Sequence, residues 1–257
     1  MCIRDSSNLT PENAEDWFRL QSRWTIDLRE YICRKIKVRR FSKFLELGSG
    51  TGTILKYFHE KCGHGEFIGV EKDLSLAEFA SKKYPELKIK SSDSLSYLKK
   101  INEKFDVIFS HFYFIWDENY QHVLREVRKH LNKEGFFLIL AEPDYGGVLE
   151  SPEPIRSDLD IKSIINFNGD PFIGRKIPVE INKAGFKTVE NGLISKLKAN
   201  LFPARNEFLE EFRFYKQFWD EFESKEESKK VEDKILGYIE KGEYFYFLPI
   251  MYFILRP

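Results

Sequence analysis

The feature that most constrains the fold is a glycine loop between a short apolar strand and a helix. Residues 44–47 predict the strand, Gly48, Gly50 and Gly52 follow at every second position, and a helical pattern begins at Ile54. Because glycine has no Cβ, such a loop lets a bound ligand approach the backbone closely. The pattern predicts the first βα unit of a ligand-binding α/β sheet.

Beyond this loop, short apolar runs alternate with helical patterns along the first half of the chain. Strict alternation of this kind implies βαβ crossovers and a parallel sheet. We therefore predict a Rossmann-like, doubly wound α/β fold with a mostly parallel seven-stranded sheet, an antiparallel last strand and helical insertions. After the first strand, the expected strands are 67–70, 87–89, 105–110, 136–140, 186–194 and 244–255.

Composition and charge restrict the partners. The 41 Lys and Arg balance 41 Asp and Glu, so the chain lacks the positive surplus that a phosphate backbone requires. No apolar run approaches the roughly 18 residues of a membrane span. Cys2, Cys33 and Cys62 form no CxxC pair, which suits a reducing compartment. We expect a cytoplasmic protein with free thiols, no membrane span and no nucleic-acid partner.

One segment departs from this balance. Residues 17–43 predict a helix and carry nine basic and two acidic residues. Charge runs usually form a solvated helix face, but this one also suits the attraction of an anionic substrate or carboxylate.

The spacing of the glycines selects among nucleotide-like ligands. A dinucleotide fingerprint, GxGxxG, would need glycine where Thr53 stands, and no Gly-Lys-Ser/Thr of a Walker loop follows. With Glu46 ahead of the loop the motif reads ExGxGxG, which resembles the class I S-adenosylmethionine-dependent methyltransferase family. The resemblance implies S-adenosyl-L-methionine as cofactor and S-adenosyl-L-homocysteine as product.

Other positions extend this resemblance. In the core they are Glu71, Asp93-Ser94, Phe105-Asp106-Val107-Ile108, and the turn Leu131-Asn132-Lys133-Glu134-Gly135, which lacks the proline and first glycine of the L-x-P-G-G pattern. Outside the core, four motifs resemble a branch of prokaryotic small-molecule methyltransferases related to those that methylate quinone precursors, mostly of unassigned substrate. They are Gln21-Ser22-Arg23-Trp24-Thr25, Ala141-Glu142-Pro143-Asp144-Tyr145-Gly146-Gly147, Asp170-Pro171-x-x-Gly174-Arg175 and Ala184-Gly185-Phe186.

The resemblance implies a division of the chain. Residues 1–16 are expected to be disordered or artefactual, because 1–6 read MCIRDS and resemble translated sequencing-adaptor sequence. Residues 17–257 then form one methyltransferase domain with an N-terminal helix at 17–43 and a cofactor-binding core at 44–142. The segments 143–175 and 199–243 are expected to cover the substrate.

The resemblance also implies which residues hold the cofactor. The glycine loop would cradle its methionine end, Glu71 its ribose and Asp93 its adenine, while Arg23 is a candidate for its carboxylate. The full set is Arg23, Glu46, Gly48, Ser49, Gly50, Gly52, Glu71, Lys72, Asp93, Ser94 and His111. No metal site is predicted.

Few catalytic groups are needed, because transfer from a sulfonium is a direct displacement that depends on alignment. His111, at the end of the fourth strand, is the candidate general base, or equally a satisfied, partly buried histidine. After the fifth strand, Glu142, Asp144 and Tyr145 complete the candidate catalytic set. Either carboxylate there is suited to orienting an acceptor or to capping the next turn.

We expect methyl transfer to a small-molecule acceptor, in a pocket at the carboxyl ends of the parallel strands, by a monomer or homodimer. Two alternatives stay open. The basic segment 17–43 would suit an RNA or protein methyltransferase, and the motifs would also suit a cofactor-binding module without activity.

Overall fold

A computed structural model describes residues 10–199, 204–220 and 224–257. Its sheet has the order β3-β2-β1-β4-β5-β8-β6, and β7 pairs with the other side of β8. The first five strands are parallel neighbours: β1 Lys43–Leu47, β2 Glu66–Glu71, β3 Lys88–Ser91, β4 Phe105–Ser110 and β5 Leu131–Pro143. The α/β fold with a mostly parallel sheet is confirmed.

The antiparallel part of the sheet is larger than expected. The last strand, β8 (Phe245–Arg256), runs antiparallel to β5, to β7 (Lys187–Ala199) and to the short β6 (Leu149–Ser151). Eight strands therefore lie within the described residues, and the prediction of seven was wrong because β6 gives no apolar signal. Its three residues, Leu-Glu-Ser, stand in a proline-rich stretch.

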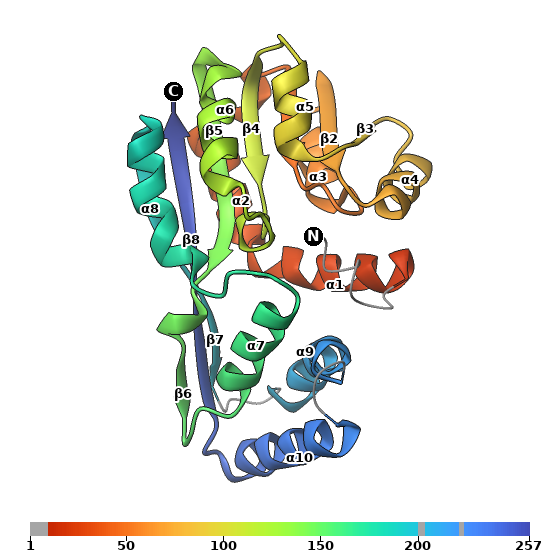
Figure 1. The fold of residues 1–257 in the computed structure, drawn as a ribbon, viewed down its shortest axis with the longest axis vertical. Helices are drawn as coiled ribbons and strands as arrows, with labels where there is room; N and C mark the ends of the chain where they lie inside the picture. The colour runs from red at the N-terminus through yellow and green to blue at the C-terminus, as the bar shows by residue number, and fades with distance from the viewer. Residues whose placement is uncertain (1–9, 200–203, 221–223) are drawn as a thin grey trace.

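The helices cover the sheet in two groups. Around the parallel strands lie α3 (Thr53–Cys62), α4 (Leu74–Lys83), α5 (Ser94–Lys100), α6 (Tyr120–Lys129) and α8 (Ile173–Ala184). Beside the far ends of β7 and β8 lie α7 (Arg156–Asn166), α9 (Ala204–Trp219) and α10 (Lys225–Lys241). Figure 1 shows α1 (Pro11–Trp24) crossing between the two groups, with α2 (Ile26–Lys35) following it.

The N-terminal helix begins earlier than expected. Thr10 caps α1 by accepting a hydrogen bond from the Asn13 N–H at 3.3 Å, and proline follows at the first helical position. Glu15, 5% exposed, accepts a hydrogen bond from the Thr53 hydroxyl at 3.1 Å. Residues 11–16 are thus folded against the core, contrary to the prediction for 1–16. Residues 1–9, with Cys2, lie outside the described residues.

The predicted single helix at 17–43 is also divided. It breaks at Thr25 into α1 and α2, and a 3₁₀ turn (Val38–Arg40) leads into β1. Thr25 serves as the C-cap of α1, and its N–H bonds to the Ser22 carbonyl at 3.3 Å.

The core lies on both faces of the parallel strands. Leu45 and Leu47 on β1 face one apolar cluster, whereas Phe44 faces the other and stacks on Phe67 with ring centroids 4.4 Å apart. Successive side chains of β1 point to opposite faces of the sheet and therefore contribute to both apolar clusters, as expected for a strand that is covered on both faces.

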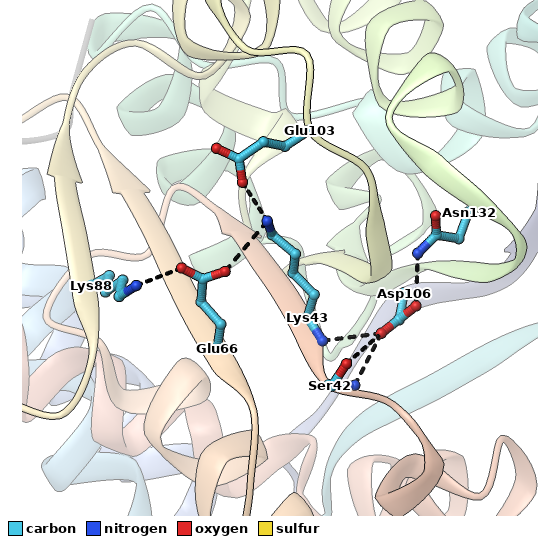
Figure 2. Close-up of polar contacts among 7 residues, drawn as sticks. All are labelled: Ser42, Lys43, Glu66, Lys88, Glu103, Asp106 and Asn132. Atoms are coloured by element: carbon cyan, nitrogen blue, oxygen red, sulfur yellow. Dashed lines mark hydrogen bonds and ion pairs between the residues drawn. The ribbon is translucent and has the colours of Figure 1, made fainter.

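Polar contacts gather at the amino ends of the parallel strands (Figure 2). There Asp106 accepts hydrogen bonds from the backbone N–H groups of Ser42 at 3.0 Å and Lys43 at 3.1 Å, and from Asn132 Nδ2 at 2.7 Å. Burial opposes ionisation, but these donors outweigh it and lower the pKa of Asp106. The aspartate of the fourth-strand motif thus joins β1, β4 and β5, and leaves the carboxyl ends open for a site.

The expected turn at 131–135 forms the start of β5. Leu131 pairs with Phe105, and the register shifts before Phe136 pairs with Val107. A Cβ on Gly135 would lie 2.9 Å from the backbone oxygens of Asn132 and Asp106, which explains the glycine there.

Two simpler observations concern the surface and the thiols. Among helices in the described ranges, none has the length and apolar character needed to cross a membrane. Cys33 and Cys62 are free and buried.

Candidate active site

A cavity of about 200 Å³ opens at the carboxyl ends of the parallel strands. Its walls come from the loop after β1, the ends of β2 and β4, the start of α5 and one face of α1. The structure brings nine of the predicted cofactor residues to this cavity: Glu46, Gly48, Ser49, Gly50, Glu71, Lys72, Asp93, Ser94 and His111.

The glycine loop has a backbone that only glycine adopts readily. Gly48 and Gly50 have φ angles of +64° and +51°. A Cβ would lie 2.5 Å from the Tyr113 ring at Gly48 and 2.7 Å from the Phe18 ring at Gly50. The loop therefore packs closely against the rings of Tyr113 and Phe18, and the backbone of its glycines forms part of the cavity wall. Gly52, φ +82°, does not line the cavity but is the N-cap of α3.

Glu71 joins the end of β2 to this loop. Its carboxylate is 6% exposed and accepts hydrogen bonds from the Gly50 N–H at 2.8 Å and the Asp73 N–H at 2.9 Å. Burial raises the pKa of Glu71, and the two N–H donors oppose that shift. A carboxylate has about four acceptor positions, so two stay available for a ligand in the cavity.

Glu46 and Ser49 present buried polar atoms to the same cavity. Neither Glu46 Oε2 nor Ser49 Oγ has a hydrogen-bond partner within the described part of the chain. Burial, with the nearby charge of Glu71, raises the pKa of Glu46 well above its usual range. An unsatisfied buried polar atom costs about 1–3 kcal/mol, so a ligand with donor groups here would be stabilised.

Asp93 and Ser94 lie where β3 leads into α5. Asp93 caps that helix by accepting a hydrogen bond from the Ser96 N–H at 2.9 Å, and Ser94 is 5% exposed. Both line the cavity, so the cap leaves the second carboxylate oxygen of Asp93 for a ligand.

His111 occupies the end of β4. Its Nε2 lies 3.0 Å from the Thr25 hydroxyl, and burial, with the positive charge of Arg29, holds the pKa of His111 well below its usual range. The next residue, Phe112, has φ +50°, an outlier for a bulky side chain. Such strain is typical of functional sites, and Phe112 indeed forms part of the cavity wall.

Five predicted site residues do not line this cavity: Arg23, Gly52, Glu142, Asp144 and Tyr145. Arg23 does not line it, because its side chain is 62% exposed and pairs with Glu210 at 3.0 Å. Asp144 accepts hydrogen bonds from the Gly146 N–H at 3.1 Å and from Arg175 Nε at 2.8 Å. It therefore caps the 3₁₀ turn Tyr145–Gly147, the second of the roles that the sequence left open.

Glu142 holds the backbone that follows β4. Its fully buried carboxylate accepts hydrogen bonds from the N–H groups of Tyr113 at 3.0 Å, Phe114 at 2.9 Å and Ile115 at 3.2 Å. The residue therefore fixes the loop after β4, and it does not line the cavity.

A second, smaller cavity of about 50 Å³ shares part of this wall. Trp17, Gln21, Phe112 and Trp116 line both cavities. Its other walls come from Tyr145 and from α7 and α9, with Asp160, Ser163, Tyr215 and Phe218 among them. The sequence does not single out these four residues, although all of them lie in the segments 143–175 and 199–243 that are expected to cover the substrate.

Two residues that line the second cavity, Asp160 and Tyr215, belong to a buried cluster around Arg156. Arg156, 1% exposed, pairs with Asp160 Oδ2 at 3.3 Å, and its guanidinium lies between the rings of Tyr215 and Tyr246, 4.3 and 4.4 Å from their centroids. Tyr246 also donates a hydrogen bond to Asp160 Oδ2 at 3.2 Å. These contacts fix α7 against β8 and orient one wall of the cavity.

Comparison with known proteins agrees with this geometry. Residues 44–135 match the family described as "Methyltransferase domain". Protein 235L of Invertebrate iridescent virus 6, whose assignment as a methyltransferase is itself provisional, is 28% identical over 97 residues. That match covers 38% of this chain and 36% of the viral protein, so it spans about a third of the relative.

Solved structures share the fold at low identity. The cyclopropane synthase MmaA2 from Mycobacterium tuberculosis is 14% identical with a TM-score of 0.56, covering 89% of this chain and 83% of that one. Geranyl diphosphate methyltransferase, in complex with GPP and sinefungin, is 11% identical with a TM-score of 0.50, covering 84% and 72%.

Residues 44–135, which supply most of the wall of the first cavity, therefore match a methyltransferase domain, and the solved structures share the fold of the chain.

Proposed function

We propose that this chain transfers a methyl group from S-adenosyl-L-methionine to a small-molecule acceptor. The observation that carries the proposal is the cavity at the glycine loop. Its lining includes the buried carboxylate of Glu71, and also Glu46 and Ser49, whose Oε2 and Oγ have no hydrogen-bond partner among the described residues. These groups fit the cofactor, because its ribose hydroxyls and its ammonium group are donors that such acceptors satisfy.

Each residue has a defined part in holding the cofactor. Glu71 would accept hydrogen bonds from the ribose hydroxyls, and Asp93 with Ser94 would face the adenine. Glu46 and the backbone from Gly48 to Gly50 would meet the methionine end. The bound sulfonium supplies an already activated methyl group, so the protein contributes alignment and exclusion of water.

We assign the acceptor to the second cavity and to the adjoining part of the first cavity, where His111 lies. The second cavity shares Trp17, Gln21, Phe112 and Trp116 with the cofactor cavity, so a molecule within it would meet the cofactor at that shared wall. Aromatic walls with a few polar groups are typical of small-molecule sites.

A polyanionic acceptor is less well supported by the basic segment 17–43. Four of its nine basic side chains form ion pairs with carboxylates of the described residues: Arg23, Arg34, Lys35 and Lys43. Paired charges attract a phosphate backbone less, because their counter-charges accompany them.

Calorimetry with S-adenosyl-L-homocysteine tests the cofactor, and no detectable binding would refute the proposal. Labelled S-adenosyl-L-methionine, incubated with fractionated extract, then tests the acceptor. We expect label in the fraction that passes a size filter; label on retained RNA or protein would favour the alternative. Phe218 lines the second cavity and not the first, so Phe218→Ala should reduce transfer and leave cofactor affinity unchanged, whereas exposed Leu149→Ala should change neither.

A further inference from the structure

A buried hydroxyl links the cavity histidine to a buried arginine. Thr25, 1% exposed, lies at the junction of α1 and α2, with its Oγ1 3.0 Å from His111 Nε2. The same Oγ1 accepts a hydrogen bond from Nη1 of Arg29, which is 3% exposed and lies 4.5 Å from the centroid of the Tyr57 ring. Arg29 Nη1 also donates to the Ser22 carbonyl at 2.8 Å.

The hydrogen-bonding capacities of these groups determine where the Thr25 proton points. The hydroxyl has one hydrogen to donate and two lone pairs, and Arg29 can only donate. Two acceptors are in reach: His111 Nε2 at 3.0 Å and the Ser22 carbonyl at 3.3 Å. Because Arg29 already supplies the Ser22 carbonyl and the imidazole contact is shorter, the hydroxyl donates to Nε2.

We propose that Thr25, held by Arg29, fixes His111 as the neutral tautomer with its hydrogen on Nδ1. Nδ1 makes no hydrogen bond to any residue in the described ranges, and His111 lines the cavity. His111 therefore presents an N–H donor to the cavity and has no free basic nitrogen there. Thr25 and Arg29 are positioning residues that act through this ring.

A His111 that donates an N–H to the cavity restricts the class of acceptor that can react, a step that rests on the proposed function. A donor at His111 orients an oxygen but takes no proton, so the acceptor must arrive with its lone pair available. An ionised oxygen, as in a carboxylate or phenolate, meets this need. Its lone pair forms the bond to the methyl carbon and the C–S pair leaves with sulfur, so oxyanion and sulfonium charges cancel and no proton is released. The positive charge of Arg29, which contacts the hydroxyl that bonds to His111, also favours a negatively charged acceptor.

Ring-¹⁵N NMR of the full chain, labelled at histidine, tests the tautomer at neutral pH without any acceptor. The His111 signals are assigned by their loss in His111→Asn. We expect hydrogen on Nδ1 in the wild type and in Thr25→Ser, which keeps the hydroxyl, and a shift toward the Nε2–H tautomer in Thr25→Val. Hydrogen on Nε2 in the wild type, or an unchanged tautomer in Thr25→Val, would overturn the proposal.

The catalytic meaning is tested by two substitutions of the histidine. Asparagine places an amide N–H near the position of Nδ1 and has no basic nitrogen, whereas alanine offers neither. With the acceptor fraction from extract, His111→Ala should lose roughly tenfold or more in turnover and His111→Asn distinctly less. Equal losses in both variants would show that His111 acts as a base. The NMR measurement needs neither cofactor nor acceptor. A protein that transfers no methyl group would therefore still show whether His111 carries its hydrogen on Nδ1.

Discussion

The carboxylate of Glu71 accepts a hydrogen bond from the Gly50 N–H at 2.8 Å, so the end of β2 holds the glycine loop that follows β1. One side chain thereby shapes the loop and keeps acceptor positions on the cavity wall. Loop geometry and ligand affinity should therefore change together when Glu71 is altered.

Replacing Glu71 with alanine should weaken the binding of S-adenosyl-L-homocysteine by roughly 10- to 100-fold. This range corresponds to about 1.4–2.7 kcal/mol, close to the loss of one hydrogen bond to a charged acceptor. Calorimetry measures the affinity directly. Glu78→Gln, on the exposed surface of α4, is the matched control and should bind like the wild type. Equal affinities of Glu71→Ala and the control would remove Glu71 from the cofactor site.

Arg23→Ala should leave the affinity for S-adenosyl-L-homocysteine within about twofold of the wild type, the range expected for a residue without ligand contact. The structure turns this side chain toward Glu210 on α9, away from the cavity. A tenfold loss in the same calorimetric assay would mean that Arg23 changes partner when the cofactor binds. Glu210→Gln, which removes the ion pair but leaves Arg23, would then separate the two roles.

The sequence predicted which residues after β1, β2 and β3 line the first cavity because its signals there are local. Glycines at every second position and a carboxylate at a strand end, such as Glu71, can be recognised within a few residues. The same strand-end signal made Glu142 a candidate catalytic residue, and only the fold shows that its carboxylate accepts hydrogen bonds from three backbone N–H groups.

The second cavity and the contact between Thr25 and His111 depend instead on packing between distant segments. Thr25 and His111 are 86 residues apart, and no periodicity connects them. Asp160 and Phe218 reach the second cavity only once α7 and α9 are placed beside α1. Sequence patterns predict that these helices exist but contain no information on how they pack.

Glu142→Gln should flatten the dependence of stability on pH. Burial raises the pKa of Glu142 from 4.5 to about 8, so the folded state keeps this proton after the unfolded chain has released it. The free energy of unfolding therefore falls as pH rises from about 4.5 to about 8, by roughly 2–4 kcal/mol from this group. Denaturant unfolding across pH 5 to 8 should show a smaller fall in the variant. A fall equal to that of the wild type, or of exposed Glu134→Gln, would contradict the assignment.

Two glycine substitutions should change stability in opposite directions. A Cβ at Gly174, in α8, would lie 2.9 Å from Asp144 Cβ and 3.0 Å from the Pro143 carbonyl oxygen, where β5 ends. Gly174→Ala should therefore cost roughly 1–3 kcal/mol, as overpacking does. At Gly237, inside α10, a Cβ would meet no atom of the described residues within 4 Å, and Gly237→Ala should gain roughly 0.5–1 kcal/mol.

Guanidinium unfolding of both variants measures these changes against the wild type. The cost at Gly174 would account for the glycine in Asp170-Pro171-x-x-Gly174-Arg175 by close packing of α8 on the end of β5, with no ligand contact required. Because Arg175 pairs with Asp144 from the same helix turn, displacing α8 should also loosen the cap that Asp144 forms on the turn after β5. A stability of Gly174→Ala equal to that of the wild type would show that α8 yields without cost, and the motif would then need a functional explanation.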